Sequence, residues 1–455
     1  MYKFKSLLFP LIMGFVWLLN GCSTEPAVSY QVLHIEGVTW ACNISTSYAA
    51  FGSTIESGKS EKVTLPVSDG DLLYAFNEDD HELYYRYRVE EGNRLVVTFD
   101  TVNTNSAHVN GSLASLQLSQ EPASWEKFKG LSPTEVSQLS SLYIQDNLTK
   151  EILNVLKVHE LSLQGTGVVL ENSTGSGALK SLLSICRPEW LGLEGGVDLS
   201  GASHEKFLSD LELLWISEDI QAVSNIINCC TNLEALIITE WEPSRGELIT
   251  LDGLKNLHSL TLAACSITDL SNLELPASLT RLHLIGCDTL TNIDGLDQIS
   301  NLASLSLSGS DQVEPLEVIN NLESLKWISF PGNTTQEAFL SILNSQEMLE
   351  VVEINQCSLI SNLSLLEDQV NLKALIFNAE KYDMEQLVAL DQVELIILNS
   401  TFFDDSPEMI SQLRTQLPNT EIVPGSGLCL GSGWLMLLLP LILLARFMVR
   451  NRSQS

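Results

Sequence analysis

The chain has 455 residues, of which 45% are hydrophobic, and its formal net charge is −33. A chain of this length can bury a large core and form more than one domain. Five of its basic residues lie in two end segments that hold no acid, so the stretch between them is more acidic still. Such a surface repels polyanions, which argues against nucleic acid and anionic lipid head groups as partners. The nine cysteines include no CxxC pair and indicate neither a zinc site nor a dense disulfide framework.

Residues 1–21 have the layout of an export signal. A basic start precedes an apolar run that ends at Leu19 and is too short for a stable spanning helix. The sequence LNGC at residues 19–22 resembles the lipobox of bacterial lipoproteins. This resemblance implies cleavage before Cys22, lipidation of the Cys22 thiol and a short anchored linker over residues 22–27. The alternative is an ordinary signal peptide with an incidental cysteine.

Residues 425–455 predict a second attachment to a membrane. A Gly/Ser linker over 425–433 leads into a short apolar helix, and the tail beyond it holds Arg446, Arg450 and Arg452. These arginines should stay cytoplasmic, which places the preceding chain outside the cytoplasm. The segment 434–455 resembles bacterial sorting tails of the GlyGly-CTERM type, which hold a protein at the inner membrane until a protease cuts them. The alternative is a plain C-terminal anchor.

Residues 28–118 predict a small all-β, sandwich-like domain. Strand-like stretches are separated by turn residues and cover 28–44, 62–67, 72–77, 83–89 and 95–100. Residues 84–99 predict a hairpin with its turn at 91–93. A polar stretch with a proline at 119–124 marks the end of this domain. The short helix expected around Trp125 would cap the domain that follows.

Residues 119–424 predict a second domain with caps, and from about residue 130 one phrase recurs in it, namely a leucine, two variable residues and then leucine-x-leucine. Its clearest copies start 20–27 residues apart, at Leu233, Leu257, Leu279, Leu302, Leu322, Leu349, Leu372 and Val393. Weaker copies start at Leu139, Val158, Leu191 and Leu211. A period of about 20–29 residues with this phrase is similar to that of the leucine-rich-repeat family. The resemblance implies an α/β solenoid with a curved parallel sheet and short convex helices.

The stretches between the copies differ in character. Apolar residues at helical spacing predict convex helices at 336–343 and 384–390. Residues 409–423 predict a last helix and strand that close the open edge of the sheet.

Three cysteines occupy the position where the family phrase has asparagine or cysteine, three residues after the last core position of a repeat. They are Cys265, Cys287 and Cys357. At this position the chain turns away from the strand, so we predict a structural ladder of buried thiols that act as small hydrophobes and weak donors. Metal binding is not expected, because successive repeats would hold the sulfurs in a row and not in a tetrahedron.

The candidate binding surface is the concave face of the predicted sheet. In each copy, the residue between the two later core positions should point away from the core. These residues are Trp215, Ile237, Thr261, His283, Ser306, Lys326 and Glu353, followed by Ile376 and Ile397. Their mixed chemistry suits a protein or peptide better than a phosphate-rich ligand. The competing hypothesis is that none of this face binds anything, because a fold alone does not supply a function.

No catalytic signature such as HExxH, GxSxG or a phosphate-binding glycine loop occurs in the sequence. The acidic run at 78–82 could bind calcium, but a solvated loop is the simpler interpretation. We therefore predict no enzyme activity and no cofactor. The leading hypothesis is a membrane-tethered protein of the bacterial cell envelope, with its main domains in the periplasm or at the cell surface. Its partner would be an envelope or extracellular protein or peptide. The alternatives are a structural surface component without a discrete ligand and a hydrolase that acts through the N-terminal domain.

Overall fold

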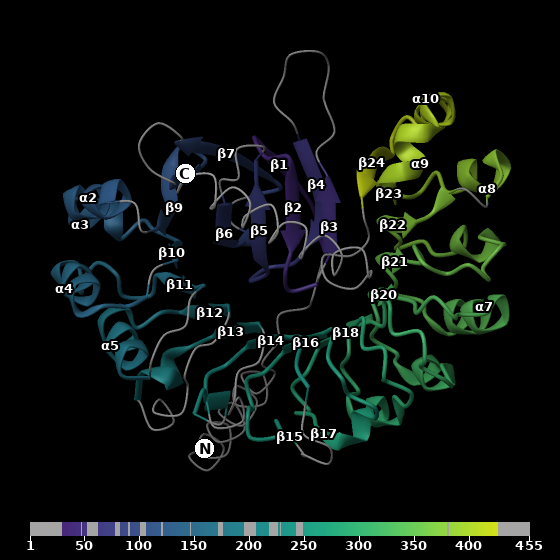
Figure 1. Ribbon diagram of the computed structural model, residues 1–455. Helices are drawn as coiled ribbons and strands as arrows, with labels where there is room; N and C mark the ends of the chain where they lie inside the picture. The colour runs from purple at the N-terminus through teal and green to yellow at the C-terminus, as the bar shows by residue number, and fades with distance from the viewer. Residues whose placement is uncertain are drawn as a thin grey trace, which may run out of the picture.

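Figure 1 shows a computed structural model of the chain. It describes residues 30–425 except 47, 52–61, 78–81, 90–91, 101–105, 120–121, 146, 172–175, 195–205, 218–225, 228, 243–248 and 380–381. The predicted export signal, Cys22 and the predicted C-terminal tail lie outside the described residues. Within the described part, no helix is long and apolar enough to cross a membrane.

A long curved sheet runs through most of the described chain, with helices and turns on its outer side (Figure 1). Each strand pairs in parallel with the strand of the next repeat. The strands are β9 (Ser112–Leu118), β10 (Ser141–Ile144), β11 (Gly167–Leu170), β12 (Trp190–Glu194), β13 (Leu213–Ser217), β14 (Ala235–Thr239), β16 (Ser259–Ala263), β18 (Arg281–Ile285), β19 (Ser304–Ser306), β20 (Trp327–Ser329), β21 (Val351–Glu353), β22 (Ala374–Phe377), β23 (Leu395–Asn399) and β24 (Glu421–Gly425). This is the predicted leucine-rich-repeat solenoid.

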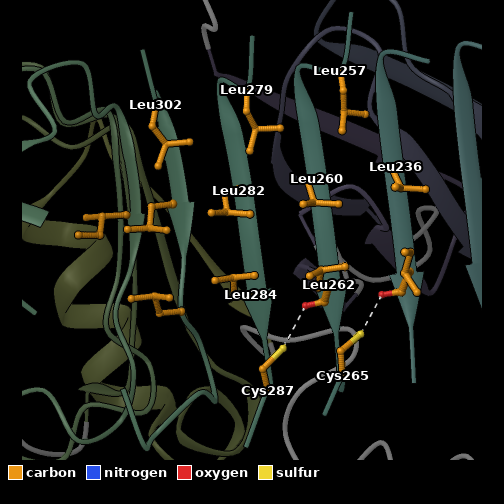
Figure 2. Close-up of a cluster of buried hydrophobic side chains, with 14 of the residues drawn as sticks. Leu236, Leu257, Leu260, Leu262, Cys265, Leu279, Leu282, Leu284, Cys287 and Leu302 are labelled. Carbon is orange, nitrogen blue, oxygen red and sulfur yellow. Dashed lines mark hydrogen bonds between the residues drawn. The ribbon is translucent and has the colours of Figure 1, made fainter. Parts of the chain in front are cut away.

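The leucines of the repeated phrase form one continuous core between the sheet and the convex elements. Figure 2 shows Leu236, Leu260 and Leu282 side by side on consecutive strands, and all three are fully buried. A single repeat could not bury its leucines alone, so each one depends on its neighbours. Burial of one such side chain contributes about 1.5–3 kcal/mol, and stacking therefore holds the solenoid together.

Short helices and 3-10 turns cover the convex side. They are α2 (Pro122–Gly130), α3 (Pro133–Val136), α4 (Lys150–Val158), α5 (Ser176–Cys186), η2 (Lys206–Asp210), η3 (Leu270–Asn272), η4 (Asp294–Gln298), η5 (Glu317–Asn321), α7 (Gln336–Ser345), η6 (Ser364–Leu366), α8 (Met384–Val388), α9 (Ser400–Asp405) and α10 (Pro407–Gln416), with a two-stranded pair of β15 (Ile249–Thr250) and β17 (Leu273–Glu274). The predicted helices around Trp125, at 336–343 and at 384–390 are confirmed as α2, α7 and α8. The Thr335 hydroxyl caps α7 by accepting a hydrogen bond from the Ala338 amide at 3.2 Å.

The cysteine ladder is also confirmed. Cys265, Cys287 and Cys357 are buried thiols that form no disulfide. The Cys265 thiol donates to the Ile238 carbonyl at 3.6 Å, and the Cys287 thiol to the Leu262 carbonyl at 3.5 Å (Figure 2). Each thiol thus bonds a backbone carbonyl of the preceding repeat and occupies an interior position that no substrate reaches.

One repeat has a different register from the one predicted. Its phrase starts at Leu325 and not at Leu322, because Ile328 pairs with the core residue Leu305 and Trp327 lies on the concave side. The assignment of Lys326 to the concave column was therefore wrong, and Ser329 takes that place. Lys326 precedes β20 and lies 3.4 Å from a carboxylate oxygen of Glu350. The shift removes most of the uneven spacing between copies.

The N-terminal region forms two small sheets, as the predicted all-β domain requires. Its strands are β1 (Gln31–Glu36), β2 (Trp40–Asn43), β3 (Tyr48–Phe51), β4 (Lys62–Val67), β5 (Leu72–Phe76), β6 (Glu82–Arg86), β7 (Arg94–Asp100) and β8 (Ser106–Val109). One sheet has the order β4–β1–β7–β8, and the other has the order β3–β2–β5–β6. Gly37 breaks the predicted 28–44 strand with a φ of +86°, and a Cβ there would lie 2.1 Å from the Val97 carbonyl oxygen. We call this unit, β1–β8, the β-domain.

The predicted hairpin over residues 84–99 was wrong. β6 pairs with β5, whereas β7 pairs in parallel with β1 in the other sheet. The chain therefore passes from one sheet to the other between β6 and β7, and Leu95 and Val97 of β7 join the apolar cluster between the two sheets.

The β-domain lies inside the arc of the solenoid (Figure 1). β9 pairs with β8 on one edge and with β10 on the other, so this strand belongs to both units. At the far end of the arc, β3 pairs with β24 through Ala50 and Gly425. The β-domain therefore links the first and last strands of the solenoid.

Gly167 supplies the space for a tryptophan on the concave side. A Cβ on Gly167 would lie 1.8 Å from Cε2 of Trp190. We expect Gly167→Ala to displace this ring and to lower the free energy of unfolding by about 1–3 kcal/mol, as overpacking does. Urea denaturation measures the change. The matched control is Gly177→Ala, because nothing lies within 4 Å of a Cβ there; an equal loss in both variants would contradict the explanation.

Candidate functional site

The concave face holds the predicted binding residues, and the β-domain covers them. The exposed fractions are 8% for Trp215, 1% for Ile237, 0% for Thr261, 1% for His283, 3% for Ser306, 4% for Glu353, 1% for Ile376 and 1% for Ile397. The structure thus places these residues along one face but turns all of them toward the chain's own β-domain. What they contact there defines the chemistry of the face.

At the centre of the arc, the turn after β2 touches two predicted residues. The Ser45 carbonyl accepts a hydrogen bond from the Thr261 hydroxyl at 2.7 Å and lies 2.8 Å from Nδ1 of His283. A carbonyl only accepts, so Nδ1 carries the proton and Nε2 accepts from the Ser304 hydroxyl at 2.7 Å. Burial lowers the pKa of His283 to about 4, so the ring is neutral at pH 7.

The Ser304–His283 contact has the geometry of a nucleophile and its base. Ser304 and His283 are 0% and 1% exposed, however, and the Ser45 turn lies against the imidazole. A substrate cannot reach them in this arrangement, so the pair serves to orient the histidine. Among the described residues, no group of three or more histidine, cysteine, aspartate or glutamate side chains could hold a metal ion.

The acidic run at 78–82 contributes one described residue, Glu82. It accepts a hydrogen bond from the Tyr74 hydroxyl at 2.9 Å. The other four residues of this acidic run lie outside the described residues.

A buried ion pair joins the β-domain to the middle of the solenoid. Asp71 is 0% exposed and lies 2.5 Å from Nη1 of Arg281 on β18. The same carboxylate accepts hydrogen bonds from the Asn43 side-chain amide at 2.7 Å and from the Ser68 backbone amide at 2.8 Å. Three groups, namely the Arg281 guanidinium, the Asn43 side-chain amide and the Ser68 backbone amide, therefore share one carboxylate as their partner.

Along the first repeats, arginines of the β-domain meet a row of glutamates. Arg86 on β6 donates to Glu189 at 2.5 Å and to Glu212 at 2.8 Å, and its other terminal nitrogen lies 3.6 Å from Glu234. Arg88 also pairs with Glu189. The three glutamates precede β12, β13 and β14 at equivalent positions, so they form a ladder along one edge of the face. We call this contact the first rim.

Across the width of the same repeats, the contact is aromatic. Tyr84 of β6 lies 5.9 Å from Trp215 and 5.2 Å from Tyr143, measured between ring centroids. The Tyr84 hydroxyl donates to Glu194 at 2.9 Å. Alternate residues of β6 and of the segment after it, namely Tyr84, Arg86 and Arg88, thus all point at the solenoid, as the period of a strand requires.

Along the last repeats, the contact is largely apolar. Tyr30 packs on Trp327 with ring centroids 4.7 Å apart. The apolar side chains here belong to one cluster with the β-domain, and they are Val351, Ala374, Ile376, Leu395, Ile397 and Val423. Glu353 lies on this part of the concave face, where Oε2 accepts from the Ser329 hydroxyl at 2.7 Å. Burial raises the pKa of Glu353 to about 8, so this carboxyl is largely protonated at pH 7.

At the mouth of the arc, a second charged contact holds the β-domain to the last strand. Glu421 of β24 lies 2.6 Å from Nζ of Lys62 and accepts from the Thr64 hydroxyl at 3.2 Å. Nε2 of His34 lies 3.7 Å from the other oxygen of Glu421. We call this contact the second rim. Together with the β3–β24 pairing, it closes the arc.

Sequence reasoning found the face but missed its occupant. The missed residues are Asp71, Arg86, Arg88, Arg281 and the glutamates of the first rim. Two signals were present in the sequence. Tyrosine and arginine alternate over residues 85–88, and glutamate recurs before consecutive strands at 189, 212 and 234. Neither signal identifies its partner, because the paired segments are about 100 or more residues apart.

The fold and this face define the class of the molecule, a leucine-rich-repeat solenoid whose concave side is filled by an N-terminal β-domain. No protein-family model matches the sequence, and no curated protein matches it. Among solved structures, the chain is similar to an internalin (inlF) from Listeria monocytogenes str. 4b F2365, with 16% identity and a TM-score of 0.34 over 63% of this chain and 74% of that one. It is also similar to internalin C2 (inlC2) from the same strain, with 20% identity and a TM-score of 0.31 over 42% of this chain and 83% of that one. Likenesses at this level carry no information on function.

Proposed function

We propose that the protein is exported, tethered to the membrane of a bacterial envelope, and binds a protein or peptide there without catalysing a reaction. The predicted export signal with its lipobox and the predicted C-terminal tail support the location. The long solenoid supports the binding, because stacked repeats create extended concave surfaces.

One observation carries the binding half of this proposal. The concave face already accommodates a folded protein unit, through apolar side chains in the last repeats and charged or aromatic ones in the first. Protein interfaces combine these ingredients, with an apolar centre and polar edges. A surface of this kind suits a protein better than a sugar phosphate or a nucleic acid.

Membrane fractionation tests the tether. We expect the full chain, its Cys22→Ser variant and a chain ending at Gly433 all to stay with the membrane, because one attachment remains in each. The chain with both changes should move to the soluble fraction. Intact mass would show the lipid on Cys22 and the position of the C-terminus. A full chain that is soluble and retains Met1 would contradict export and tethering together.

Photo-crosslinking in intact cells tests the binding. A crosslinking residue is placed at Leu161 or at Val370, which are 91% and 82% exposed and lie in repeats far apart along the solenoid. We expect a discrete product with one envelope or extracellular protein. The control is the doubly untethered chain, which should give less of this product. Products that contain only copies of the chain itself would favour the structural-component alternative instead.

A further inference from the structure

Besides the buried Asp71–Arg281 pair and the apolar and aromatic contacts of the concave face, charged side chains hold the β-domain in the arc at its two rims. At the first rim, Arg86 and Arg88 meet Glu189 and Glu212. At the second rim, Lys62 meets Glu421. Among the described residues, one backbone pairing, between Ala50 and Gly425, joins the β-domain to the far end of the solenoid. Side-chain pairs of this kind can be exchanged for others, whereas an extended strand ladder cannot be exchanged without unfolding.

The seam between the two units also contains polar atoms that are imperfectly satisfied. Among the described residues, Trp215 Nε1, Trp327 Nε1, Glu353 Oε1 and Arg86 Nε are buried and have no hydrogen-bond partner. All four side chains lie on the concave face or on the strand that covers it. Folded domains satisfy roughly 90% or more of such groups, so four on one seam indicate a fit below that of a domain core. Each unpaired group lowers the cost of separating the two surfaces.

From these features, we propose that the β-domain is a displaceable occupant of the concave face, and that a protein partner reaches this face by exchanging with it. This proposal rests on the proposed function, because it describes how the binding partner gains access to the same concave face. The shared strand β9 keeps the β-domain attached to the first repeats. The opposite side of the β-domain, at the second rim, then leaves the mouth of the arc. The opening therefore proceeds from Glu421 toward Glu189.

The apolar side chains of the last repeats explain why the exchange needs a partner. Without a cover, the face would expose Trp327, Ile376, Leu395, Ile397 and neighbouring residues as one large apolar patch, which soluble proteins avoid. The open state is therefore rare in the free protein. A protein partner with an apolar surface stabilises the open state by taking the place of the β-domain on the concave face.

Thiol labelling measures the opening without any partner. Ser306 is small, 3% exposed and on the concave face, so Ser306→Cys reports when the cover leaves. Native Cys287 is the internal control, because it lies in the solenoid core at 0% exposure and reacts only when the solenoid itself opens. The full chain carries Cys229→Ser, since Cys229 is a partly exposed thiol that would also react with the label. Mass spectrometry assigns the labelled site.

Two sets of substitutions should change the labelling rate of the cysteine at residue 306 in opposite directions. Arg86→Met together with Lys62→Met weakens both rims, and we expect residue 306 to react at least tenfold faster while Cys287 changes little. Ala50→Cys with Gly425→Cys places cysteines at paired positions, where Cα atoms about 4.5–5.5 Å apart suit a disulfide. We expect this lock to slow labelling of residue 306 at least tenfold relative to Ala50→Cys alone.

The matched control is Arg94→Met. It removes an arginine–glutamate pair within the β-domain, with Glu36, and does not touch the seam; labelling of residue 306 should stay unchanged. Equal rates at residue 306 and Cys287 in every variant would overturn the proposal, because the cover would then leave only on global unfolding. Since no partner is used, a failure of the crosslinking experiment and a failure of this one are distinguishable.

Discussion

Replacing Asp71 with alanine is expected to lower the free energy of unfolding by about 3–5 kcal/mol, since removing one partner of a buried ion pair leaves the other charge uncompensated. Arg281 is that partner, at 2.5 Å, and its side chain is only 12% exposed. The Asn43 and Ser68 donors lose their acceptor in the same variant. Urea denaturation followed by circular dichroism measures the loss.

A double-mutant cycle separates the pair from its surroundings. In Asp71→Ala with Arg281→Met, no buried charge is left alone, so we expect part of the stability to return. Glu36→Gln is the control, because it breaks an arginine pair that is largely exposed; exposed pairs contribute little. Losses that simply add in the double variant would show that Asp71 and Arg281 act independently, contrary to their contact.

The repeats could be predicted from the sequence because their information is local. In each copy, the leucine positions and the strand between them lie within about ten residues, and the neighbouring copy supplies the rest of the packing. This is why several convex helices follow from the spacing of apolar residues, and why the sheet and the cysteine ladder follow from the repeated phrase and its resemblance to the leucine-rich-repeat family. One copy was predicted in the wrong register because Leu322, Leu325 and Ile328 are all apolar and are spaced three residues apart. Only pairing with Leu305 decides between the two registers.

The occupant of the arc could not be predicted, because its contacts join distant segments. Ser45 meets Thr261 and His283, Asp71 meets Arg281, and Lys62 meets Glu421. None of these pairs lies within one repeat or one turn, so no periodic pattern contains them. The mixed chemistry of the concave column has a physical explanation in the structure. Thr261 and His283 face the Ser45 turn, whereas Ile376 and Ile397 belong to one apolar cluster with the core of the β-domain.

Replacing Glu353 with glutamine should make the protein more stable at pH 8 but not at pH 4.5. Burial raises the pKa of Glu353 to about 8 in the folded chain, against about 4.3 for an unfolded glutamate. Between these values, the unfolded chain releases a proton that the folded chain retains. The stability that Glu353 contributes is therefore fully present below about pH 4.3 and is lost as the pH rises through 8. Each unit of pKa difference corresponds to about 1.4 kcal/mol, so we expect a difference of several kcal/mol at pH 8.

The variant must be compared with the parent chain at each pH, because His283 acts in the opposite sense. Its folded pKa of about 4 lies below the usual 6.5, so its contribution is present above pH 6.5 and falls as the pH drops through 4. Subtracting the two unfolding free energies cancels this effect and isolates residue 353. Glu367→Gln, at an exposed position, serves as the control for a glutamate-to-glutamine change. If Glu353→Gln gives a constant difference from pH 4.5 to 8, Glu353 is ionised beneath the β-domain and water reaches this part of the seam.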